Sequence, residues 1–93
     1  MRLTKAEILA IKETVLQRDE GAKIYLFGSR VDDAKRGGDI DLLVLSSKIT
    51  FREKLEIKLD MYDRMGEQKI DLLIEQDESK PFTRIALEEG VLL

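Results

Sequence analysis

Hydrophobic residues recur along this chain with two spacings, one typical of helices and one typical of strands. Ile8, Ile11 and Val15 recur every three to four residues, as on one face of a helix. Short continuous apolar runs, such as the run that ends at Phe27, are typical of buried strands. In order, the pattern predicts a helix, two strands, a helix, a strand and a helix, over residues 5–18, 23–27, 39–45, 50–65, 69–75 and 79–90.

Polar residues at the ends of the predicted helices support these boundaries. Thr4 and Glu7 have the spacing of a capping box, as do Thr50 and Glu53. The last helix has Ser79 as its expected N-cap and a proline within its first turn. Glycine is the expected end of each helix, at Gly21, Gly66 and Gly90.

The long second helix carries more apolar residues than a single stripe needs. One stripe is predicted to face the core and consists of Phe51, Leu55, Leu59 and Tyr62. Further apolar residues extend around the helix, namely Ile57, Met61 and Met65. Two interpretations of this extension stay open, more core or an additional surface for a partner protein.

The order of elements predicts an α/β (α+β) fold, in which helices pack on one side of a small mixed sheet. A length of 93 residues indicates one domain, residues 1–93. The net charge of −3 argues against broad affinity for nucleic acids or anionic membranes. The chain has no cysteine and begins without the apolar run of a signal peptide, so we expect a cytoplasmic protein.

The candidate chemistry lies at the ends of the first two predicted strands. Gly28 and Ser29 follow the first strand, and the second strand carries Asp39 and Asp41. Alternate residues of a strand point to one face, about 6.6 Å apart along the chain, so the two carboxylates lie side by side. Their repulsion is about 4 kcal/mol at an effective dielectric constant of about 20, and oxygen ligands suit Mg²⁺. A Gly-Ser turn beside them offers N–H groups and a hydroxyl to phosphate, so the pattern indicates a site for a metal-bound nucleoside triphosphate.

This combination resembles the minimal nucleotidyltransferases of the DNA polymerase β superfamily, whose hallmark is Gly-Ser, a loop and then Asp-x-Asp. Here nine residues separate Ser29 from Asp39. The third predicted strand supplies Asp71, which matches the third carboxylate of that family. The resemblance covers essentially the whole chain and is most specific between residues 28 and 44.

The resemblance implies a role for each of these residues. Asp39 and Asp41 would bridge two Mg²⁺ ions about 4 Å apart. Asp71 would bind the second ion and help to deprotonate an acceptor hydroxyl. Gly28 and Ser29 would hold the β- and γ-phosphates of ATP for in-line attack, and Arg30 would either contact phosphate or form a salt bridge with a neighbouring aspartate.

Each residue also has a purely structural interpretation. Gly28 alone would be an ordinary turn and Ser29 the cap of a short helical turn. The two aspartates alone would be an exposed strand face, although their neighbours indicate a buried strand, where a carboxylate pair is uncommon unless it is paired or metal-bound.

The resemblance also suggests an acceptor and a partner. Stand-alone proteins of this kind are often encoded beside an all-helical HEPN protein, an RNase toxin, and act as antitoxins that transfer AMP from ATP to a tyrosine of the toxin. Two alternatives stay open. One is a non-catalytic antitoxin that occludes its HEPN partner, and the other is nucleotidyl transfer to a small molecule or an RNA end.

Overall fold

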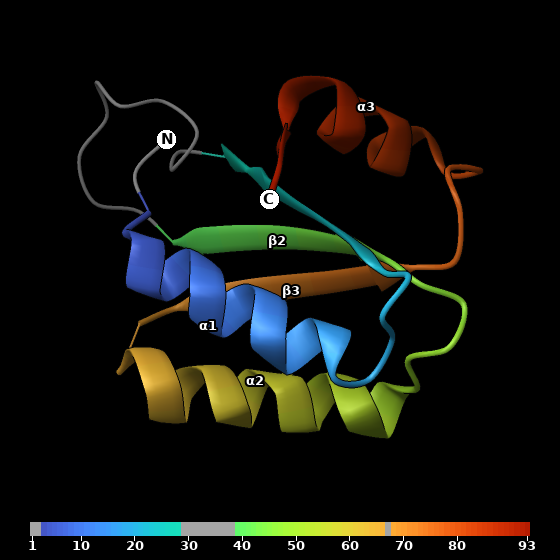
Figure 1. Cartoon of the computed structure of the whole chain (residues 1–93). Coiled ribbons are helices and arrows are strands. Elements are labelled where there is room, and N and C mark those ends of the chain that lie inside the picture. Colours follow the sequence, from blue (N-terminus) through green and yellow to red (C-terminus); the bar gives the residue numbers. More distant parts are fainter. Residues whose placement is uncertain (1–2, 29–38, 67) are drawn as a thin grey trace.

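The residues that the structure describes form three helices and a four-stranded mixed sheet (Figure 1). This computed structural model describes residues 3–28, 39–66 and 68–93. The α+β architecture agrees with the fold class predicted from the sequence. In chain order the elements are α1 (Lys5–Leu16), β1 (Lys23–Phe27), β2 (Ile40–Leu45), α2 (Phe51–Met65), β3 (Ile70–Glu75), α3 (Pro81–Glu89) and β4 (Val91–Leu92).

Both predicted capping boxes are present. The side chain of Thr4 accepts from the Glu7 N–H at 3.0 Å, and the Glu7 carboxylate accepts from the Thr4 N–H at 2.9 Å. Thr50 and Glu53 repeat this arrangement at the start of α2. Gly66 ends α2 with a φ of 84°, a conformation that favours glycine, as the sequence predicted.

Two other predicted helix ends are wrong. Helix α1 ends at Leu16, so Gly21 lies in the following turn and does not end the helix. The N-cap of α3 is Lys80, which makes no side-chain cap hydrogen bond, whereas the predicted cap Ser79 donates its N–H to Asp77. Pro81 at the first helical position sets the start of α3, because its fixed φ suits the first turn.

The strands pair in the order β3-β2-β1-β4. Strands β1 and β2 are antiparallel, and β2 and β3 are parallel, with α2 as the crossover between them. Strand β4 was not predicted, because two residues are too few to show a period. It is antiparallel to β1 and reaches it through Gly90, where a Cβ atom would lie 2.6 Å from the carbonyl oxygen of Ala86.

One face of the sheet packs on α1 and α2 and forms the core. Alternate strand residues supply it, and they meet buried residues of both helices. The strand residues are Ile24, Leu26, Ile40, Leu42, Val44, Ile70 and Leu72, and the helix residues are Ile11, Val15, Ile57 and Met61.

The predicted core stripe of α2 is wrong for three of its four residues, since only Tyr62 packs against the core. Ile57 and Met61 are the fully buried residues of α2, so the interpretation of the further apolar residues as a partner surface is wrong for both of them. Two ion pairs connect α2 to α1 and the turn after it: Arg18, in that turn, pairs with Asp60 at 3.2 Å, and Glu13 of α1 pairs with Arg64 at 3.0 Å. The predicted stripe instead leaves three side chains exposed, which we call the α2 stripe: Phe51 at 73%, Leu55 at 49% and Leu59 at 66%.

Helix α3 lies against the opposite face of the sheet, above the strands in Figure 1. Its Phe82 contacts Phe27, which alternates along β1 with the core residues Ile24 and Leu26. The expectation of helices on one side of the sheet therefore holds for α1 and α2 but not for α3. None of the helices in the described residues combines the length and apolar composition that crossing a bilayer requires.

Candidate functional site

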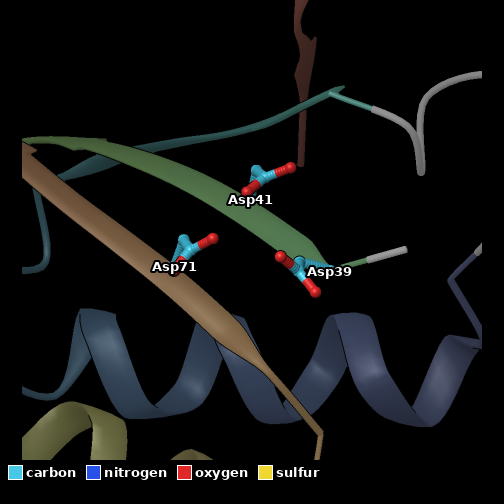
Figure 2. Close-up of side chains that lie close together, drawn as sticks. All are labelled: Asp39, Asp41 and Asp71. Carbon is cyan, nitrogen blue, oxygen red and sulfur yellow. The ribbon is translucent and has the colours of Figure 1, made fainter.

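Three carboxylates meet at one end of the sheet (Figure 2). Asp41 belongs to β2 and Asp39 directly precedes that strand, while Asp71 belongs to β3. The parallel register places Asp41 and Asp71 opposite each other. Each of the three offers an oxygen within 4.8 Å of those of the other two. The structure thus brings together the three aspartates singled out from the sequence.

Strand alternation explains why these acidic side chains avoid the core. Ile40 and Leu42 are fully buried on the core face, so Asp39 and Asp41 point away from it. Leu43, on the outer side of β2, is also fully buried. Asp41 therefore lies at the border of a covered apolar surface, whereas Asp71 is exposed.

The electrostatics of Asp41 reflect this crowding. Its pKa is raised to about 6, first because burial removes water from the carboxylate. A hydrogen bond between the Asp41 and Asp71 carboxyl groups, which needs a proton on one of them, and the negative charges of Asp71 and Asp39 raise this pKa further. A bound cation would reverse these effects by compensating the negative charge.

The donor set fits a hard divalent cation. All three candidate ligands are carboxylates, and Mg²⁺ prefers oxygen ligands. Their oxygens bring three negative charges close together, and among the residues that the structure describes these charges are only partly compensated. Asp39, Asp41 and Asp71 would therefore be the residues that hold Mg²⁺.

That partial compensation comes from Lys69, a residue that the sequence analysis used only to mark a strand. Its Nζ lies 3.3 Å from Asp39 Oδ2, although 72% of the side chain is exposed. The hydrogen bond and charge of Asp39, followed by the charge of Asp71, raise the pKa of Lys69. The signal for it was present in the sequence, since Lys69 precedes Asp71 by two residues and shares its side of the strand.

Gly28 lies directly beside Asp41. Its φ of 76° is in the left-handed region, where other residues are strained. A Cβ atom at this position would overlap Asp41 Oδ2 and lie 3.2 Å from Asp41 Cγ. Glycine is therefore required both by the turn and by the carboxylate. Ser29 and Arg30, and the predicted short helical turn after Ser29, lie outside the described residues, so their phosphate contacts stay predictions.

Comparison with known proteins agrees with this geometry. No curated protein matches the chain. A family model described as "Polymerase beta, Nucleotidyltransferase" matches residues 10–93, which include Gly28 and all three aspartates. The chain therefore belongs to the polymerase beta nucleotidyltransferase family.

Proposed function

We propose that this protein transfers AMP from ATP to a hydroxyl acceptor in a Mg²⁺-dependent reaction. The observation that carries the proposal is the group of three carboxylates within 4.8 Å of one another, with Gly28 against Asp41. In the reaction, the acceptor oxygen forms a bond to the α-phosphorus of ATP. The bond from that phosphorus to the β-phosphate bridging oxygen breaks, and pyrophosphate leaves with the electron pair.

The residues of the site divide these tasks. Asp39, Asp41 and Asp71 would hold Mg²⁺, which when bound neutralises phosphate charge and aligns the triphosphate. Gly28 leaves room for the Asp41 carboxylate at the end of the strand, because that carboxylate occupies the space that a Cβ atom would need. Asp71 is the most exposed of the three and is therefore the best placed to meet an incoming acceptor and take up its proton.

For the acceptor we propose a tyrosine hydroxyl of a HEPN RNase toxin, as the family resemblance implies. The α2 stripe supports a protein partner, because three large apolar side chains exposed on one helix are unusual unless something covers them. It lies on α2, on the core side of the sheet, and the carboxylates lie on the other side (Figure 2). A partner bound there would not cover the carboxylates, and its tyrosine would have to reach them past the edge of the sheet.

The same separation favours one alternative, a module that neutralises its partner by occlusion alone. Binding through the α2 stripe requires none of the three aspartates. Transfer to an RNA end has less support, because a net charge of −3 and an acidic site offer little attraction to a polyanion.

Co-expression with the protein encoded beside this chain, which the proposal expects to be a HEPN toxin, tests the proposal. Intact mass spectrometry should show the partner heavier by AMP units with the wild type. Asp41→Asn should still bind the partner but neither modify nor neutralise it. An unmodified yet neutralised partner would show that occlusion, not transfer, is the function.

A second pair of variants tests the partner surface. Leu59→Lys should weaken partner binding, because it places a charge in the α2 stripe. Leu9→Lys is the matched control, since Leu9 is a similarly exposed leucine on α1. Equal binding of both variants in a pull-down would show that the partner docks elsewhere.

A further inference from the structure

The side of the sheet that carries the aspartates also carries an aromatic pair, Phe27 and Phe82. Phe27 is the register partner of Asp41 across β1 and β2, so the two side chains lie on the same face as direct neighbours. The ring of Phe82, from α3, meets the ring of Phe27 edge to face, with centroids 6.0 Å apart and an angle of 78°. An apolar wall thus begins beside the carboxylates and extends away from them.

Unlike a contact in the core, this apolar wall is exposed to solvent. Phe82 is 55% exposed, and Ile85, one helical turn further along α3, is 53% exposed. Their neighbours Thr83 and Ala86 are buried and hold α3 to the protein. Anchoring α3 therefore does not use the exposed surface of Phe82 and Ile85, which is free to bind a ligand.

We propose that Phe82, supported by Phe27, is a stacking platform for the nucleobase of the bound triphosphate. The inference rests on the proposed nucleotidyl transfer, which places the α-phosphate at the aspartates. A ribose then carries the base away from the carboxylates, and the aromatic pair begins on the neighbouring strand, at the register partner of Asp41. The edge-to-face contact occupies one side of the aromatic pair and leaves ring surface for a stacked base.

The chemistry of the platform predicts its selectivity. Phe27, Phe82 and Ile85 carry no side-chain hydrogen-bonding groups, so they recognise ring area and not the polar edge of a base. Purines should therefore bind more tightly than pyrimidines, and ATP and GTP should bind about equally well. Removal of one stacking ring should weaken nucleotide binding about tenfold.

Equilibrium binding of ATP, GTP, CTP and tripolyphosphate, each with Mg²⁺, tests the proposal without turnover. Phe82→Ala should weaken ATP and GTP about tenfold and leave tripolyphosphate unchanged, because only the nucleotides have a base. Phe82→Trp should keep the affinity for ATP and GTP, because it retains an aromatic ring, whereas Phe82→Leu should lose affinity as Phe82→Ala does. Phe51→Ala is the matched control, an exposed phenylalanine of the α2 stripe, and should change nothing. Phe82 is the main target because its exposure makes the truncation tolerable to the fold, which a thermal melt checks.

The possible outcomes distinguish failure of the stacking platform from failure of the proposed nucleotidyl transfer. If the wild type binds tripolyphosphate but Phe82→Ala keeps the wild-type ratio of ATP to tripolyphosphate affinity, the platform is wrong and the phosphate site stands. If Phe82→Ala instead raises only the KM for the acceptor, the ring serves the acceptor and the proposal is overturned. Failure of the wild type to bind tripolyphosphate or ATP would overturn the proposed function and the platform with it.

Discussion

The two faces of the sheet differ most clearly at strand β2, which is apolar on the core side and carries acidic residues on the other. On the core side, Ile40, Leu42 and Val44 are fully buried among apolar neighbours. On the other side, Asp41 lies close to Asp39 and Asp71, and its burial, together with the hydrogen bond to Asp71 and these neighbouring charges, raises its pKa to about 6. One face stabilises the fold and the other stores electrostatic repulsion that a cation or a proton relieves. Single substitutions at adjacent residues of β2 should therefore affect stability and function separately.

The largest effect is expected on the core face. Leu42→Ala should lower the free energy of unfolding by about 2–5 kcal/mol, because it leaves a cavity among residues that cannot all move. Urea denaturation measures this loss. Leu9→Ala, at an exposed leucine of α1, is the control and should cost much less. Similar losses in both variants would remove the basis for assigning stability to this face.

A smaller loss is expected where the backbone meets the carboxylates. Gly28→Ala should destabilise the protein by about 2 kcal/mol, because the new Cβ is strained at φ 76° and displaces the Asp41 carboxylate. Gly66→Ala is the control, since φ is 84° there but no atom lies within 4 Å of the added Cβ. A thermal melt should show a larger loss of stability for Gly28→Ala than for Gly66→Ala. Gly28→Ala should also bind Mg²⁺ more weakly, whereas Gly66→Ala should bind it as the wild type does.

The repulsion at the aspartates predicts a pH dependence of stability. The pKa of Asp41 is about 6 in the folded protein and near 3.8 when unfolded, so the folded state holds this proton more tightly. Stability from Asp41 is therefore full below pH 4 and is lost as the pH rises through 6, by about 1–2 kcal/mol for this partly exposed group.

Denaturation of the metal-free protein against pH checks this sign. Asp41→Asn should be more stable than the wild type at pH 7 and equal to it near pH 4, and saturating Mg²⁺ should reverse the order at pH 7. Comparing the two proteins isolates Asp41 from carboxylates such as Asp19, whose pKa is lowered. A constant difference across this pH range would contradict the raised pKa.

The smallest effect concerns the lysine beside the site. Lys69→Gln should strengthen Mg²⁺ binding several-fold, because the cation that partly neutralises Asp39 is removed. Titration with Mg²⁺, or with Mn²⁺ as a spectroscopic substitute, measures the change. Lys80→Gln is the matched control. The Nζ of Lys80 lies 3.2 Å from Glu75 Oε1, and Glu75 is at the other end of β3 from Asp71. Weaker Mg²⁺ binding in Lys69→Gln would mean that the lysine supports the site instead of competing with the ion.

Features that depend only on neighbours along the chain could be predicted from the amino-acid sequence. Capping boxes at Thr4 and Thr50 require contacts over three residues, and strand alternation requires only the next residue. For this reason the helices, the three longer strands and the outward direction of Asp39 and Asp41 could all be predicted. The requirement for glycine at position 28 was only partly visible, because the turn is local but the contact with Asp41 is not.

Tertiary structure decided everything that depends on which distant segments meet. Helix α2 has two apolar stripes, and only its packing against the sheet and α1 decided that Ile57 and Met61 enter the core. The placement of α3 on the opposite face and the pairing of the short β4 likewise depend on contacts with β1. Asp71 joins Asp41 only because β3 is parallel to β2 in one register, and a shift by one residue would turn Asp71 toward the core. The acidic residues are a property of the sequence, but the site exists because the fold forces their like charges together.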